Sequence, residues 1–101
     1  WAMASWAKTL SNEVAEYGVT VNNILPGFTD TERLQSLMKN RAINLNKTIK
    51  EIKSNTILNI PAKRFGKPEE IADATSFLCS KSASYINGIN LPIDGGFSKS
   101  L

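Results

Sequence analysis

The residues best suited to chemistry gather in one short loop, Pro26-Gly27-Phe28-Thr29-Asp30-Thr31-Glu32. Proline fixes the direction of the backbone, glycine lets it approach a ligand closely, and threonine hydroxyls and amides can bond polar groups. The loop follows an apolar, β-branched run, and in open α/β sheets ligands bind beyond the carboxyl ends of the strands. The loop is therefore a candidate binding site, and a tight turn with a helix cap is the alternative.

Composition excludes several other kinds of site. The sequence contains no histidine and a single cysteine, Cys79. These residues cannot build a Ser-His or Cys-His mechanism, a Cys/His zinc site or a disulfide within the chain. We expect no metal, and we expect Cys79 to be a packing thiol on a buried helix rather than a reactive group.

Length and charge restrict the class of protein. The 101 residues allow one domain, and 12 Lys and Arg against 9 Asp and Glu give a net charge of +3. That balance is too mild to indicate nucleic acid or an anionic membrane as a partner, and no apolar run approaches the roughly 18 residues that span a bilayer. A solvated helix face, with nucleic-acid binding as the distant alternative, is our interpretation of Lys39, Arg41, Lys47, Lys50 and Lys53.

Hydrophobic periodicity predicts about four helices. We expect them at 3–17, after a cap at Thr29 or Asp30, within 39–60 with uncertain limits, and from Pro68 onward, with one further helical turn at 82–85. The apolar residues that support them are Met3, Trp6, Leu10, Val14, Tyr17, Leu34, Leu37, Met38, Ile49, Ile52, Ile60, Ile71, Ala74 and Leu78.

Two strands are predicted, and the helices between them indicate a parallel α/β sheet. Gly18 ends the first helix, and the β-branched run 19–25 leads to Pro26. The second strand covers 89–93, and Pro92 places it at a sheet edge or a bulge because proline donates no ladder hydrogen bond. A two-stranded sheet is marginal in water, so the first strand should have a further partner outside this sequence.

Several segments, in order and spacing, resemble the C-terminal half of the short-chain dehydrogenase/reductase family. The first matches that family's pattern Val-Asn-x-Ile-x-Pro-Gly-x-x-x-Thr. Each segment alone is weak, but together they extend over nearly the whole chain. They are Thr9-Leu10-Ser11-Asn12-Glu13-Val14, Val21-Asn22-Asn23-Ile24-Leu25-Pro26-Gly27-Phe28-Thr29-Asp30-Thr31, Arg64-Phe65-Gly66-Lys67-Pro68-Glu69-Glu70-Ile71-Ala72, Phe77-Leu78, Tyr85-Ile86-Asn87-Gly88 and Ile93-Asp94-Gly95-Gly96.

The resemblance implies a fold and an activity. Residues 1–101 would be the C-terminal portion of a doubly wound, parallel-sheet Rossmann-type domain, with the two strands as the sixth strand and the edge strand of its sheet. The cofactor would be NAD or NADP, the substrate a small carbonyl or alcohol compound, and the assembly a homotetramer. A 3-oxoacyl-carrier-protein reductase-like activity is the commonest in such sequences, but the segment 34–60 would form variable substrate-covering helices that do not reveal the substrate.

The resemblance also assigns cofactor-binding residues. Pro26, Gly27 and the backbone at Phe28 and Thr29 would lie against the nicotinamide carboxamide. Thr31 would reach the carboxamide or the pyrophosphate through its hydroxyl. Thr29 replaces the Ile or Val that the family often has, which matters little because the contact there is made by the backbone.

The family's catalytic machinery does not occur in these residues. Neither Gly-x-x-x-Gly-x-Gly nor Tyr-x-x-x-Lys is present. In the family the tyrosine is the general acid/base and the lysine lowers its pKa. Since the chain opens at Trp1 without an initiator methionine, we expect it to be a piece of a longer parent protein whose catalytic lysine precedes Trp1. No residue of the chain is assigned a catalytic role, and Trp1 and Trp6 are expected in a core or an interface.

Two functions remain open. The first is part of a cytoplasmic NAD(P)-dependent oxidoreductase, to which this segment supplies the nicotinamide-side loop, the substrate lid and an oligomer surface. The second is a non-catalytic structural module that assembles with itself or binds a partner through the open flank of the first strand. Similarly, Asp94-Gly95-Gly96 is either a simple turn or part of a subunit interface.

The isolated 101-residue chain is expected to have no dehydrogenase activity, because the proton-transfer and cofactor-loop residues are missing from it. The purified chain should not consume NADH or NADPH with any carbonyl substrate. Turnover above the rate without protein would contradict this prediction.

Overall fold

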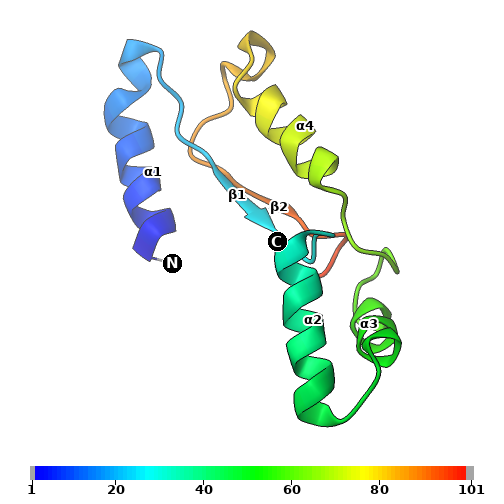
Figure 1. The fold of residues 1–101 in the computed structure, drawn as a ribbon. Helices are drawn as coiled ribbons and strands as arrows, with labels where there is room; N and C mark the ends of the chain where they lie inside the picture. The colour runs from blue at the N-terminus through cyan, green and yellow to red at the C-terminus, as the bar shows by residue number, and fades with distance from the viewer. Residues whose placement is uncertain (1, 100–101) are drawn as a thin grey trace.

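The computed structural model describes residues 2–99 and contains four α-helices, two 3₁₀ turns and two strands. Along the chain they are α1 (Ala2–Val14), η1 (Ala15–Tyr17), β1 (Asn23–Pro26), α2 (Glu32–Leu45), α3 (Ile49–Leu58), α4 (Pro68–Leu78), η2 (Lys81–Ala83) and β2 (Asn90–Ile93) (Figure 1).

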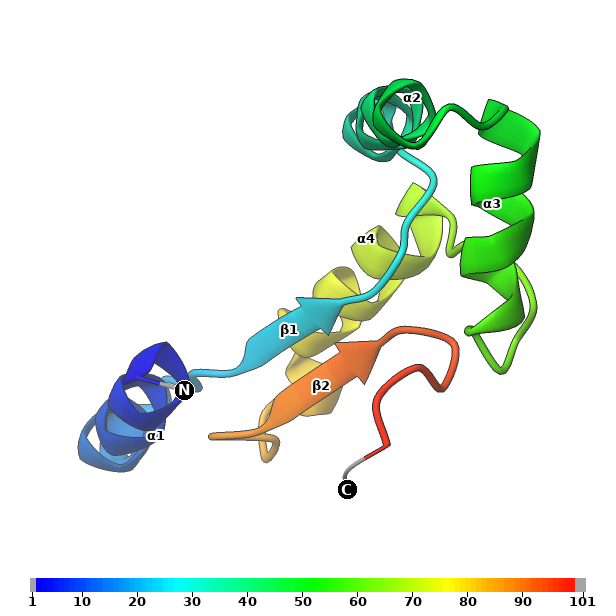
Figure 2. The same cartoon turned by 90° about the horizontal axis from the view of Figure 1, so that it is seen from below.

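The two strands form a parallel pair, in the register Asn23 to Asn90 through Pro26 to Ile93. Helices α1 and α4 lie on either side of this pair (Figure 1), and α2 and α3 lie beyond the carboxyl ends of both strands (Figure 2). The predicted α/β class with a parallel sheet is confirmed. Within residues 2–99, β1 has β2 as its one strand partner, so its other flank is open as expected.

Local signals placed two helix ends correctly and one incorrectly. Gly18 ends the first helical segment with a φ of 75°, and its amide donates to Ala15 at 3.1 Å. Helix α4 begins at Pro68 as predicted. The predicted cap of α2 at Thr29 or Asp30 is wrong, since Thr31 accepts from the Leu34 amide. Backbone hydrogen bonds to Gly66, far along the chain, hold this segment extended until Thr31.

The apolar core lies between α2, α3 and the segment that follows them. Its buried residues are Met38, Ala42, Ile52, Ile60 and Phe65, with Leu34 and Ile57 packed against them. Ile60, predicted as a helix residue, follows the end of α3 but is buried to 2% exposure. The region 39–60, for which one helix with uncertain limits was predicted, therefore contains the carboxyl part of α2, a short connection and α3.

Asparagine side chains interrupt the backbone ladder where the first strand was predicted to begin. Residues 19–22 are not part of β1. Instead the Val21 amide donates to the Asn87 side chain at 2.9 Å, and the Asn22 side chain bonds Ile86 at 3.1 Å and Ile89 at 3.1 Å. The β-branched composition of 19–25 suggested a longer strand, but the Asn87 side chain takes the Val21 amide, while the Val21 carbonyl accepts from the Gly88 amide at 2.9 Å.

Helix α1 turns a small-residue face toward this asparagine region. Ala7 and Ser11 are its buried residues, and Asn87 donates to the Ser11 carbonyl at 2.9 Å. Part of the predicted apolar stripe faces outward instead, with Met3 70% and Trp6 62% exposed, whereas Leu10 and Val14 are half-buried. Of the core or interface position expected for Trp6, the core is wrong and the interface stays a prediction, whereas Trp1 lies outside the described residues.

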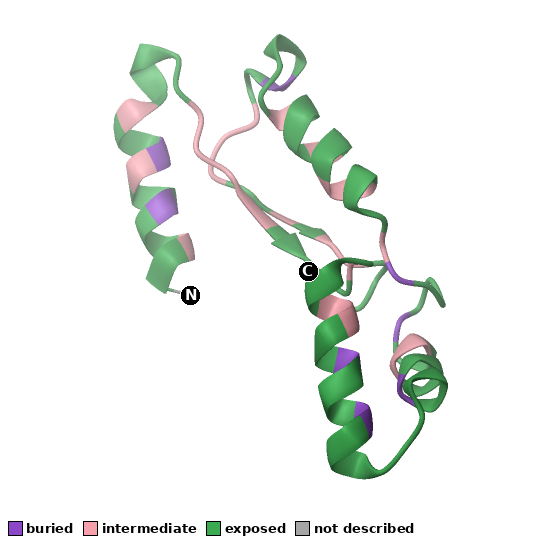
Figure 3. Ribbon diagram, viewed as in Figure 1, coloured by how far each residue is buried: buried purple, intermediate pink, exposed green. Residues whose placement is uncertain are grey.

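The chain covers only part of its own apolar surface. Its Cα radius of gyration is 16.9 Å, against about 13 Å for a compact domain of this length. Buried segments are few and separated (Figure 3). Cys79 is exposed at the carboxyl end of α4, so its predicted burial is wrong; within the described residues α4 has no buried residue against which the thiol could pack. No helix within residues 2–99 is long and apolar enough to cross a bilayer.

Replacing Asn87 with alanine in the parent protein is expected to lower the free energy of unfolding by about 1–3 kcal/mol, because the Val21 amide and the Ser11 carbonyl lose their partner. Urea denaturation measures the change. The control is Asn90→Ala, which removes an exposed side-chain hydrogen bond to Asn23 and should cost about 0.5 kcal/mol or less. Equal losses in the two variants would contradict this assignment.

Candidate functional site

An open groove of about 520 Å³ lies beyond the carboxyl end of β1. Its floor is the predicted binding loop, and its walls come from the first turns of α2 and α4. All five residues predicted to bind the cofactor line it. The complete lining is Pro26, Gly27, Phe28, Thr29, Thr31, Arg33, Leu34, Leu37, Pro68 and Ile71.

Gly27 holds the start of the loop against the end of β2. Its amide donates to the Ile93 carbonyl at 3.0 Å and so extends the parallel pairing past the strand. A Cβ at position 27 would lie 2.6 Å from Asp94 Cβ and 2.8 Å from Asp94 Cα. Because one of those atoms is backbone, no side-chain rotation at Asp94 relieves the overlap, and glycine is required for this close approach.

A backbone bridge to Gly66 fixes the next part of the loop. The Gly66 amide donates to the Phe28 carbonyl at 2.9 Å, and the Asp30 amide donates to the Gly66 carbonyl at 2.8 Å. Thr29 is the centre of this parallel bridge, so its own amide and carbonyl point away from Gly66. Within residues 2–99 these two groups have no hydrogen-bond partner. The bridge also explains why α2 cannot begin before Thr31.

Thr31 has a structural role and keeps a donor. Its hydroxyl oxygen accepts from the Leu34 amide at 3.3 Å and caps α2. The hydroxyl hydrogen is not used in that bond and can still be donated. Thr31 therefore combines the two alternatives that the sequence left open, the helix cap and a potential ligand contact.

Aromatic packing supports the loop at Phe28. Its ring stands edge-on to Phe97 with 5.4 Å between the ring centroids, and it is tilted against Phe65 with 6.3 Å between them. These pairs add to the burial of apolar area. The side chain of Phe28 thus anchors the loop within the chain, and the contact of its backbone with a cofactor stays a prediction.

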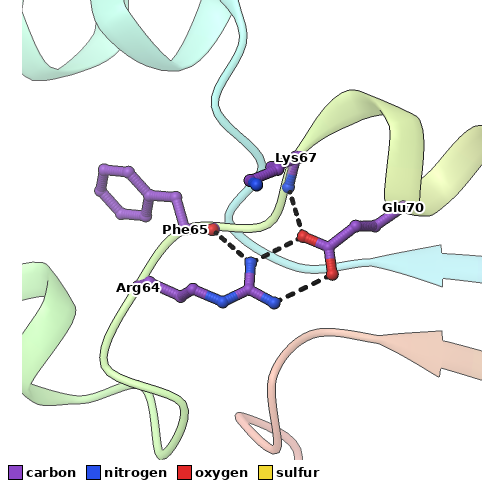
Figure 4. Close-up of polar contacts among 4 residues, drawn as sticks. All are labelled: Arg64, Phe65, Lys67 and Glu70. Atoms are coloured by element: carbon purple, nitrogen blue, oxygen red, sulfur yellow. Dashed lines mark hydrogen bonds and ion pairs between the residues drawn. The ribbon is translucent and has the colours of Figure 1, made fainter.

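An ion pair holds the segment that carries Gly66 (Figure 4). The Arg64 guanidinium donates to both carboxylate oxygens of Glu70, at 2.6 and 2.9 Å. Arg64 also donates to the Phe65 carbonyl at 3.1 Å, and Glu70 accepts from the Lys67 amide at 2.9 Å. Both ends of the turn around Gly66 are therefore tied to Glu70. We call this set of contacts the Arg64–Glu70 clamp.

The clamp keeps Glu70 charged. The Arg64 guanidinium, followed by the hydrogen bond from the Lys67 amide, lowers the pKa of Glu70 from 4.5 to about 2. In the folded protein the pair therefore stays ionised until the pH falls close to 2, and the stability that it contributes is complete above pH 4.5. The sequence indicated Glu70 only as an acid in the first turn of a helix, and an arginine six residues earlier is too weak a signal to predict the pair.

Asp94 forms the turn that follows β2. Its carboxylate oxygens accept from the Gly96 and Ser98 amides, each at 3.0 Å, and contacts with Ser98 lower the pKa of Asp94. Ala62 donates to the Gly95 carbonyl at 3.0 Å. The turn alternative for 94–96 is therefore present, and it packs on the segment after α3.

Sequence reasoning missed half of the groove. Arg33, Leu34 and Leu37 reach it from α2, and Pro68 and Ile71 reach it from α4. Arg33 and Leu37 lie four residues apart, which puts them on one helix face directly after the Thr31 cap. That spacing could have indicated the α2 wall, whereas the α4 wall depends on tertiary packing.

Comparison with known proteins supports a common family. The family model described as "Enoyl-(Acyl carrier protein) reductase" matches residues 1–98. The 3-oxoacyl-[acyl-carrier-protein] reductase FabG of Buchnera aphidicola is 42% identical over 92 residues, which are 88% of this chain and 32% of that protein. The NADPH-dependent reductase BacG of Bacillus subtilis is 38% identical, with 99% of this chain and 39% of that protein aligned.

Solved structures have the same architecture. A short chain dehydrogenase family protein from Francisella tularensis superposes with a TM-score of 0.92 at 31% identity, covering 98% of this chain and 41% of that one. The chain thus spans about a third of the length of the curated relatives it matches.

Replacing Glu70 with glutamine in the parent protein is expected to destabilise it at neutral pH and to leave its stability nearly unchanged near pH 2. The pKa of Glu70 is lowered in the folded state, so its stabilisation is complete above about 4.5 and is lost as the pH falls toward about 2. Urea denaturation from pH 7 to 2 measures the difference between variant and wild type.

The matched control is Glu69→Gln, which removes a charge from the same helix turn but no ion pair within residues 2–99. Its effect on stability at neutral pH should be smaller than that of Glu70→Gln, because no ion pair is lost. If the two variants behaved alike, helix-end electrostatics rather than the clamp would explain the loss.

Proposed function

Because the chain belongs to the short-chain dehydrogenase/reductase family, we propose that it is part of an NAD(P)-dependent oxidoreductase. The parent enzyme transfers a hydride between the nicotinamide cofactor and a small carbonyl or alcohol substrate. The observation that carries this proposal is the groove at the carboxyl end of β1, in which the five residues assigned to the cofactor meet. The ligand site of open α/β sheets lies at this same edge.

The loop fits a nicotinamide carboxamide chemically. A carboxamide presents one carbonyl acceptor and an NH₂ donor, as an asparagine side chain does. The amide and carbonyl of Thr29, which have no partner within residues 2–99, and the remaining hydroxyl hydrogen of Thr31 are complementary to these groups. When bound, the cofactor supplies the hydride chemistry. The contribution of this chain is to orient the ring through Pro26, Gly27, Phe28, Thr29 and Thr31.

The α2–α3 pair is proposed as the substrate lid. Leu34 and Leu37 give the groove an apolar wall beside the loop, and such a wall excludes water from a hydride-transfer site. A 3-oxoacyl-carrier-protein reductase-like activity is proposed on the similarity to the Buchnera enzyme. The chain's own groove is built to hold a small carbonyl compound whose body is apolar.

Assembly and location complete the proposal. The exposed side chains of Met3 and Trp6 on α1 are suited to pack against another surface, and we propose that they contribute to a homotetramer. We propose that the enzyme is cytoplasmic.

The rival function, a non-catalytic module, is favoured by the open flank of β1. The coding sequence upstream of Trp1 separates the two: a Tyr-x-x-x-Lys supports the enzyme, and a start codon supports the module.

The direct test uses the parent protein with NADPH or NADH and a 3-oxoacyl thioester or a simpler ketone. Consumption of the reduced cofactor supports the proposal. Failure of both cofactors to bind, measured by fluorescence titration, would contradict it whatever the substrate.

Thr31→Val in the parent protein is expected to weaken NAD(P)H binding by roughly tenfold, because a hydrogen bond to the cofactor is lost. The substitution also removes a helix cap, which costs about 1 kcal/mol of stability. Thr48→Val is the matched control, since Thr48 caps α3 by accepting from Glu51 at 3.2 Å and lies outside the groove. Both variants should lose similar stability, and only Thr31→Val should lose cofactor affinity. Equal affinities would show that Thr31 is a cap alone.

A further inference from the structure

We propose that Arg33 makes the groove select substrates that carry an anionic oxygen group, a carboxylate or a phosphate, next to an apolar body. This inference rests on the proposed function, because it names the substrate class of the same site. It assigns to Arg33 the role of a specificity-determining residue.

Charge in the groove comes from one side chain. Among the described residues that line it, Arg33 alone carries a charge; the walls beside it are Leu34, Leu37, Pro68 and Ile71. Binding sites for small molecules are commonly apolar with a few placed polar groups that decide specificity. A single guanidinium in such a wall favours a ligand with one anionic end.

The guanidinium of Arg33 is available for a ligand. Within residues 2–99 the structure gives Arg33 no ion pair, whereas Arg64 is bound to Glu70. The nearby acid Asp30 accepts from the Gln35 side chain at 2.8 Å rather than from Arg33. A carboxylate or phosphate can therefore bind the planar guanidinium through two parallel hydrogen bonds without displacing an internal partner.

Helix stability does not explain an arginine at this position. Residue 33 is in the first turn of α2, where the helix dipole disfavours a cation. Thr31 already caps the helix, and Glu32 supplies the favourable charge of that turn. A cation in the first turn of a helix lowers helix stability, and where no local contact compensates for that loss, the residue indicates a functional role.

The position of Arg33 also separates two parts of the ligand. Thr31, two residues earlier, is assigned to the cofactor end of the groove, and Leu37 follows Arg33 one turn along the same helix. The anionic group would then lie on the α2 side, and the apolar body would lie along Leu34 and Leu37. The groove volume of about 520 Å³ is in the range of small-molecule sites.

The test compares Arg33→Met with wild type in the parent protein. Two matched substrate pairs are used: an oxo-carboxylate with its primary amide, and a keto-phosphate monoester with its alcohol. We expect Arg33→Met to lower kcat/KM for the anionic member of at least one pair by roughly tenfold or more, and to change the neutral member by about twofold or less. Arg33→Lys should restore part of the loss, since the charge is kept without the planar fork.

Arg41→Met is the control for surface charge. Arg41 is on the same helix, but it lines the hollows between α2 and α3 and not this groove. It should leave the ratio between anionic and neutral substrates unchanged. A similar change in both variants would overturn the proposal, as would equal losses on the charged and neutral substrates.

Two further outcomes are decisive. A loss confined to the dissociation constant of NADPH would overturn the proposal and place Arg33 against the cofactor. If wild type turns over no carbonyl compound, the proposed function fails, and calorimetric titration with a saturated alkyl carboxylate and its amide still decides the role of Arg33. Preference for the carboxylate that disappears in Arg33→Met supports the inference, and no preference in wild type overturns it.

Discussion

The bridge between Thr29 and Gly66 is the interaction on which the rest of the site depends. It holds the loop after β1 extended, delays the start of α2 until Thr31, and leaves the Thr29 backbone groups facing away from Gly66. Phe65 in the turn that carries Gly66 is buried in the core, but its neighbours Arg64 and Lys67 are exposed and need their own support. The Arg64–Glu70 clamp provides that support by tying the turn to the first turn of α4.

The two ends of the strand pair are built differently. At the amino ends, the side chains of Asn22 and Asn87 supplement the backbone hydrogen bonds, and Asn87 joins this region to the small-residue face of α1. At the carboxyl ends, backbone contacts and one required glycine at Gly27 bring the chain segments together. Side chains there are left available to line a groove. This division follows the general rule that ligand sites of parallel sheets lie at the carboxyl edge.

Much of the fold could be predicted because its signals are local. Gly18 and Pro68 mark helix ends through their own backbone preferences, and the helix–strand alternation indicates a parallel sheet. The predictions are wrong where residues far away in the sequence determine the local structure. Gly66 moves the α2 cap from Thr29 or Asp30 to Thr31, and the asparagines shorten the first strand. Similarly, the loop residues of the groove could be predicted from a sequence motif, whereas Ile71 lines the groove only because of how α4 packs in the folded chain.

The distance in sequence between Thr29 and Gly66 has a consequence for synthesis. While the ribosome extends the chain, the loop emerges well before the turn that fixes it, and α2 and α3 lie between the two. Local helices can form early, but a contact of this sequence separation waits for its second partner. The loop after β1 therefore reaches its final conformation only after the nascent chain has passed Gly66 and its supporting Glu70. A polypeptide released prematurely within α3 would carry the whole loop motif without a formed site.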